Sequence, residues 1–84
     1  MKLYTLSRDN EIEVANTNRI KFYNDVKALL TNELLDSIES LHGHGQDYEA
    51  LVIQLIDLKN NNIEILDLAH DFDYDFKIIS RFKN

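Results

Sequence analysis

The strongest constraint on the fold of this chain is an apolar stripe between residues 19 and 42. Its members recur at spacings of three and four, and the set is Tyr23, Val26, Leu30, Leu34, Ile38 and Leu41, widened by Phe22, Leu29 and Leu35. Such spacing predicts an amphipathic helix. Residues 16–18 (Asn-Thr-Asn) are typical helix-capping residues, and Gly43 stands where a left-handed C-cap residue belongs. We therefore predict one long helix over about residues 19–42, with the Thr31-Asn32 pair as a point where it could divide into two.

The residues before this helix predict a β-hairpin. Lys2 to Ser7 and Glu11 to Val14 are short runs in which apolar and polar side chains alternate, as on strands covered on one face only. The Arg8-Asp9-Asn10 segment between them supplies turn-forming residues. The chain is therefore expected to open with two antiparallel strands.

The segment after the helix fits both a strand and a helix. From Tyr48 to Leu58, both alternating sets of side chains are apolar, which is typical of a central strand buried on both faces. A helix is the competing interpretation, because some of the same residues also recur at a helical period. The β-branched residues of the segment favour the strand. The turn Lys59-Asn60-Asn61-Asn62 would then lead into a return strand from Ile63 to Ala69.

The last segment has the clearest alternation in the chain. One set of alternate positions is Phe72, Tyr74, Phe76, Ile78, Ser80 and Phe82, and the other is Asp71, Asp73, Asp75, Lys77, Ile79 and Arg81. This period predicts a final strand. We therefore expect a single α+β domain over residues 1–84, with a small antiparallel sheet in the order β-β-α-β-β-β and one long helix packed across it.

Size and composition favour binding through an outer surface. Of the 84 residues, 44% are hydrophobic, enough for one compact core. A ligand pocket of several hundred Å³ would hollow out much of a core this small. The absence of cysteine excludes disulfides and thiolate chemistry. No signal segment and no apolar run of about 18 residues is present, so we expect a cytoplasmic protein that does not enter a membrane.

Charge is the most informative feature for function. The net charge is −6, but residues 33–75 hold eleven acidic side chains and one basic one, a net charge of −10. Alternate residues on a strand lie about 6.6–6.8 Å apart, so Asp71, Asp73 and Asp75 would form a regular row of carboxylates. Adjacent phosphates of a nucleic-acid strand are separated by about 6–7 Å, so such a row could imitate a nucleic-acid backbone.

The candidate partner-binding residues are the row and the acids nearest to it in this block. They are Asp71, Asp73, Asp75, Asp67, Glu64, Asp57, Asp47 and Glu49. The alternative interpretation is a solvated face that keeps the chain soluble and protects an edge strand from aggregation.

Other kinds of site have less support in the sequence. His42 and His44, with Asp47 and His70, contain metal-ligating side chains but lack an established metal-binding spacing, so no metal or other cofactor is expected. No nucleophile motif and no Gly-rich phosphate loop is present, so we expect no enzymatic activity. Direct nucleic-acid binding through the aromatic residues of the last segment is opposed by the negative middle of the chain.

These patterns lead to the hypothesis of an acidic protein-binding module that inhibits or regulates a basic, nucleic-acid-handling partner. A concrete form is a phage or mobile-element inhibitor of a host nuclease or defence protein that acts as a nucleic-acid mimic. The alternative is a homodimerising interaction domain without enzymatic activity. It would pair through an edge strand or through the surplus helix residues Phe22, Leu29 and Leu35.

Overall fold

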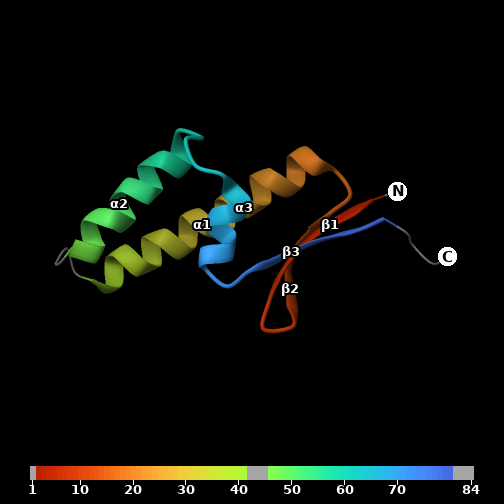
Figure 1. Cartoon of the computed structure of the whole chain (residues 1–84), viewed down its shortest axis with the longest axis horizontal. Helices are drawn as coiled ribbons and strands as arrows, with labels where there is room; N and C mark the ends of the chain where they lie inside the picture. The colour runs from red at the N-terminus through yellow and green to blue at the C-terminus, as the bar shows by residue number, and fades with distance from the viewer. Residues whose placement is uncertain (1, 42–45, 81–84) are drawn as a thin grey trace.

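The fold consists of a small sheet at one end of a long helix, with two shorter helices packed along that helix (Figure 1). The computed structural model describes residues 2–41 and 46–80. The elements in chain order are β1 (Leu3–Arg8), β2 (Glu11–Asn16), α1 (Arg19–Ser40), α2 (Gln46–Lys59), α3 (Ile65–Asp71) and β3 (Asp75–Ile79). The expected α+β class, with an antiparallel sheet and a long helix packed on it, is confirmed.

The predicted opening hairpin is confirmed. Strands β1 and β2 pair antiparallel, and Arg8 lies opposite Glu11 across a two-residue turn. Both turn residues have positive φ, 56° for Asp9 and 66° for Asn10. Two successive positive φ angles define the type I′ turn, which matches the twist of a hairpin and which Asn and Asp tolerate better than other non-glycine residues.

The predicted long helix is also confirmed, as the single uninterrupted helix α1. The Asn18 side chain accepts a hydrogen bond of 3.0 Å from the backbone N–H of Lys21, which caps the first turn. The Thr31 hydroxyl donates to the carbonyl of Lys27, so Thr31 continues the helix instead of recapping it. The Gly43 C-cap lies outside the described residues.

The core forms where α1 crosses the sheet and meets the two shorter helices. Strand β3 pairs with β1, which gives the sheet order β2-β1-β3. The Phe22 ring lies 5.8 Å from the ring of Tyr4 and 5.6 Å from that of Phe76, so it joins α1 to two strands. The buried apolar residues are Leu6, Phe22, Val26, Leu30, Leu34, Leu58, Leu68, Ala69 and Tyr74.

The strand prediction for residues 48–58 is wrong, because this segment is helix α2. Leu51, Leu55 and Leu58 recur at helical spacing, and Leu58 is completely buried in the core that α1 helps to form. A helix buries one face, so members of both alternating apolar sets that had suggested a two-sided strand lie in solvent. Ile53 is 58% exposed and Ile56 is 52% exposed.

The return strand predicted over residues 63–69 is also wrong, because helix α3 begins at Ile65 and includes the rest of this range. The asparagines before it end α2 instead of forming a hairpin. Asn61 has φ of 59°, its N–H donates to the carbonyl of Leu58, and the N–H of Asn62 donates to that of Asp57. These two bonds and the positive φ define a Schellman motif at a helix C-terminus. As expected, an asparagine of this segment adopts a positive φ, but it does so at the end of a helix and not in a hairpin turn.

The final strand is confirmed over a shorter span than predicted. It begins at Asp75, so Phe72 and Tyr74 precede it, and Phe82 lies outside the described residues. The alternation holds within β3, because Phe76 packs on Phe22 while Lys77 lies opposite Thr5 on the other face of the sheet.

Candidate acidic docking surface

Five of the predicted site residues follow one another along α3 and into β3. They are Glu64, Asp67, Asp71, Asp73 and Asp75, hereafter the α3–β3 acidic segment, and all five are exposed. No lysine or arginine occurs between residues 60 and 76. Lys77 follows directly after this stretch, and its Nζ lies 3.5 Å from Asp75 Oδ2, so the charge of Asp75 is partly balanced.

Helix α3 places three of these carboxylates on one face. Glu64 is its N-cap residue, and Asp67 and Asp71 follow at spacings of three and four. Residues at this spacing lie on the same side of a helix, with about 5–6 Å between their Cβ atoms. Leu68 and Ala69, which lie between Asp67 and Asp71 in the chain, are buried in the core and hold the helix in place.

The predicted strand row of Asp71, Asp73 and Asp75 does not exist. Asp71 is the last residue of α3, Asp73 has φ of 68°, and Asp75 is the first residue of β3. The three carboxylates therefore lie on a helix end, a turn and a strand, and the regular interval of a strand does not apply to them. The acidic residues are still clustered in the sequence, but they lie along a helix and the turn that follows it.

The turn at Asp73 is a second Schellman motif. The Asp73 N–H donates to the carbonyl of His70 at 2.9 Å, and the Tyr74 N–H donates to that of Ala69 at 3.0 Å. Asp73 occupies the left-handed position that glycine usually fills. The motif turns the chain so that Tyr74 enters the core, where it is 3% exposed, while Asp73 stays in solvent.

Helix electrostatics separates the acids that stabilise the fold from those that do not. Asp67 lies in the first turn of α3, where a negative charge interacts favourably with the unpaired N–H groups. Asp71 and Asp73 lie at the other end, beside the carbonyl groups, where a negative charge is unfavourable by about 0.3–1 kcal/mol. The charge of Asp67 thus stabilises the fold, whereas the charges of Asp71 and Asp73 do not.

The remaining predicted residues lie on α2 and do not join the same surface as a group. Asp47 and Glu49 are in its first turn, where they stabilise the helix N-terminus. Asp57 is near the other end of α2 and is half-buried. A helix of 14 residues is about 21 Å long. Asp47 and Glu49 therefore lie at the end of α2 far from α3 (Figure 1).

The base of the acidic segment is fixed by a polar cluster that the sequence did not reveal. Arg8 Nη2 lies 2.8 Å from Glu33 Oε1, and the Tyr74 hydroxyl donates to the same oxygen at 2.6 Å. The Arg8 guanidinium also stacks 4.3 Å from the centre of the Tyr74 ring and donates to the carbonyl of Phe72. The cluster thus joins β1, α1 and the turn after α3.

Burial raises the pKa of the Tyr74 hydroxyl above its ordinary value, and its hydrogen bond to Glu33 raises the pKa further. Tyr74 is therefore a neutral hydrogen-bond donor at physiological pH, with a structural role. A signal in the sequence that could have revealed this cluster is Glu33, an acid four residues after Leu29, which belongs to the widened apolar stripe.

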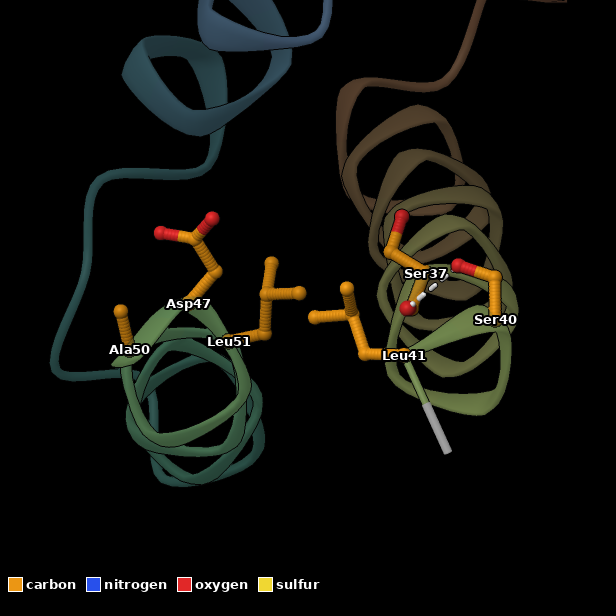
Figure 2. Close-up of a pocket in the computed structure, with 6 residues that line it drawn as sticks. All are labelled: Ser37, Ser40, Leu41, Asp47, Ala50 and Leu51. Atoms are coloured by element: carbon orange, nitrogen blue, oxygen red, sulfur yellow. Dashed lines mark hydrogen bonds between the residues drawn. The ribbon is translucent and has the colours of Figure 1, made fainter. Parts of the chain in front are cut away.

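A shallow hollow lies between the end of α1 and the start of α2 (Figure 2). Its volume is about 360 Å³, and its lining residues are Ser37, Ser40, Leu41, Asp47, Ala50 and Leu51. Leu41 and Leu51 point toward each other, and the Ser40 hydroxyl donates to the Ser37 carbonyl at 2.8 Å (Figure 2). This hydroxyl is directed at the backbone, and the lining residues include no histidine to activate it.

The histidines do not assemble a metal site in the part of the chain that the structure describes. Within residues 2–41 and 46–80, no group of three His, Asp or Glu side chains is placed to hold a metal ion. His70 is exposed on α3, and His42 and His44 lie outside the described residues. Among the described helices, none has the length and apolar character needed to cross a membrane.

Comparison with known proteins adds no assignment. No protein-family model, curated protein or solved structure matches the chain.

Proposed function

We propose that this chain is a protein-binding module that docks its α3–β3 acidic segment on a basic, nucleic-acid-handling partner and thereby inhibits or regulates it. The observation that carries the proposal is the position of Asp71 and Asp73. Both are exposed, both lie at the helix end that disfavours negative charge, and Asp71 also lies one turn from Asp67. Residues that oppose stability are typical of surfaces selected for binding.

The chemistry of the segment suits a partner that grips a phosphate backbone. Asp67 and Asp71 are separated by about 5–6 Å at their Cβ atoms, which is close to the interval of about 6–7 Å between adjacent phosphates. A groove lined by lysine and arginine would therefore accept this helix face as it accepts a nucleic-acid strand. The concrete form of the proposal is a phage or mobile-element inhibitor of a host nuclease or defence protein.

We propose a binding role without catalysis. Outer-surface binding requires no cleft, and the chain is thin, with principal extents of 52 × 26 × 15 Å. The segment is also held rigidly, because Tyr74 and Leu68 anchor it to the core from within. A rigid charged surface loses little conformational entropy on docking.

The test is a comparison of two double variants with the same net charge. Asp71→Asn with Asp73→Asn removes two charges from the proposed surface, and Asp36→Asn with Glu39→Gln removes two exposed charges from the last turns of α1. Binding to a panel of basic nucleases and DNA-binding proteins would be measured by calorimetry at low and high salt. We expect the first variant to lose at least tenfold in affinity and the second to lose less than threefold.

Three results would contradict the proposal. These are equal effects of the two double variants, an affinity that does not weaken with salt, and simultaneous binding of nucleic acid and this chain at the partner's nucleic-acid groove. Salt dependence is required because the docking is electrostatic and the groups are exposed to solvent.

The alternative of helix-mediated dimerisation through Phe22, Leu29 and Leu35 has little support at these positions. Phe22 is completely buried, Leu29 is half-buried, and Leu35 is 46% exposed. Phe22 and Leu29 therefore belong to the packing of α1 within the chain.

A further inference from the structure

Helix α2 has a second apolar face that no described part of the chain covers. Its inner face packs through Leu58 into the core, beside α1. Ile53 and Ile56 lie on the outer side, where they are 58% and 52% exposed. Single exposed apolar residues need no partner, but Ile53 and Ile56 lie three residues apart on the same helix and therefore form one apolar surface.

The outer face also has a charge pattern. Glu49, Val52, Ile56 and Lys59 follow one another at spacings of three, four and three, hereafter the α2 outer stripe. This is the spacing of the apolar seam in helices that pair along their length. The two central positions are apolar, and the two end positions carry opposite charges.

From this pattern we infer that the chain forms a symmetric antiparallel dimer through the α2 outer stripe. A two-fold axis at the level of Gln54 relates the two copies of α2. A residue a given number of positions before Gln54 then lies beside the residue the same number of positions after Gln54 in the second copy. Glu49 then meets Lys59 of the second copy, and Val52 meets Ile56 of the second copy. Each of these contacts occurs twice, as an isologous interface requires. The stripe is therefore complementary to itself in charge and in apolarity.

The surface on each side of the stripe can accept the side chains of a second copy. One hollow of about 260 Å³ is lined by Tyr48, Glu49, Val52 and Ile53. A second of about 300 Å³ lies between α1 and α2 and is lined by Lys27, Thr31, Leu35, Leu55 and Lys59. Both include a residue of the stripe, so a helix docked along the stripe would also cover the exposed part of Leu35.

The size of the stripe sets the expected strength of the dimer. A helix of 14 residues is about 21 Å long and about 10 Å wide. Two such faces bury less area than the roughly 1,200–2,000 Å² of standard stable interfaces. We therefore expect a reversible dimer with a dissociation constant in the range of about 10–100 µM.

This inference is independent of the proposed function, because the stripe and the α3–β3 acidic segment are on different helices. The dimer would present two acidic segments, so a partner with two basic sites would bind it more tightly than a monomer.

The test is sedimentation equilibrium of the whole chain at several concentrations on both sides of the expected dissociation constant. We expect Glu49→Lys and Lys59→Glu each to weaken the dimer at least fivefold, because each places like charges opposite each other. The double variant Glu49→Lys with Lys59→Glu restores the opposite pairing and is expected to recover the wild-type constant within about twofold. Asp25→Lys and Lys21→Glu are the matched controls, since both sites are exposed on α1.

Ile56→Glu provides a second measurement that does not depend on ion pairs. The side chain is half-exposed, so the variant is expected to keep the wild-type circular dichroism spectrum while becoming monomeric. A wild-type chain that is monomeric at every concentration would overturn the inference. So would a dimer that survives Ile56→Glu, a double variant no stronger than the single ones, or a dimer that Ile12→Lys on the open face of the sheet dissociates.

Discussion

Replacing Asp73 tests both physical arguments about the α3–β3 acidic segment, because its backbone and its charge act separately on stability. Its φ of 68° is a left-handed conformation. This conformation costs an ordinary L-residue about 1–2 kcal/mol and costs Asn or Asp less. Its carboxylate lies just beyond the C-terminus of α3, where a negative charge costs about 0.3–1 kcal/mol.

Three replacements separate these effects. Asp73→Asn removes the charge and keeps the tolerance of positive φ, so we expect the free energy of unfolding to rise by about 0.3–1 kcal/mol. Asp73→Gly should have about the same free energy of unfolding as Asp73→Asn. Glycine removes the cost of the left-handed backbone, but this gain is offset by the entropy that glycine adds to the unfolded chain. Asp73→Ala should be about 1 kcal/mol less stable than Asp73→Asn, because alanine has a Cβ atom and no local compensation.

The assay is thermal and urea unfolding followed by circular dichroism at low ionic strength and again at about 1 M salt, where the Debye length is about 3 Å. In a domain of this size, 1 kcal/mol corresponds to a change in Tm of about 4–8 °C. If Asp73→Ala and Asp73→Asn have the same free energy of unfolding, the backbone argument is refuted. The charge argument is refuted if Asp73→Asn is no more stable than the wild type at low salt. It is also refuted if the added stability of Asp73→Asn is the same at high salt as at low salt.

Three further predictions concern the core, the polar cluster and the hairpin. Leu58→Ala should lower the free energy of unfolding by about 2–5 kcal/mol. Ile53→Ala, on the exposed side of α2, should change it by less than about 1 kcal/mol. If urea unfolding gave similar losses for the two variants, the orientation of α2 would be wrong. Tyr74→Phe leaves the carboxylate of Glu33 without one donor, which should cost about 1–3 kcal/mol. Because the folded chain raises the pKa of Tyr74, wild-type stability should be fully present below the ordinary tyrosine pKa of about 10 and decline above it. That decline should be smaller in Tyr74→Phe, and equal declines would argue against the buried hydroxyl. Asn10→Gly should raise Tm by a few degrees, because glycine is preferred at the second position of a type I′ turn; a lower Tm would contradict the assigned turn.

Local signals in the sequence were sufficient for the hairpin, for α1 and for β3. Asp9 and Asn10 tolerate the positive φ of the turn, and Asn18 supplies the cap of α1. These features act within a few residues, so they are visible without the rest of the fold. The clustering of acids is likewise a property of the sequence, and it does not depend on which elements carry them.

The elements that carry the acids were decided by tertiary packing. Between residues 48 and 58 both alternate sets are apolar, so the period alone does not distinguish a strand buried on two faces from a helix buried on one. Helix α1 covers the sheet with only part of its apolar surface. Leu58 of α2 and Leu68 of α3 pack in the same core against the rest of it. That packing made α2 and α3 helices, outweighing the β-branched residues of α2.

The same packing determined the geometry of the acidic segment. The sequence placed Asp71, Asp73 and Asp75 at alternate positions, and a strand would have aligned them. Burial of Tyr74, with its hydrogen bond to Glu33 from a distant part of the chain, instead turns the backbone at Asp73. The sequence by itself thus determined how much negative charge gathers near residues 64–75. Only the tertiary structure decided its shape, because the contacts that bend the chain there join residues more than forty positions apart.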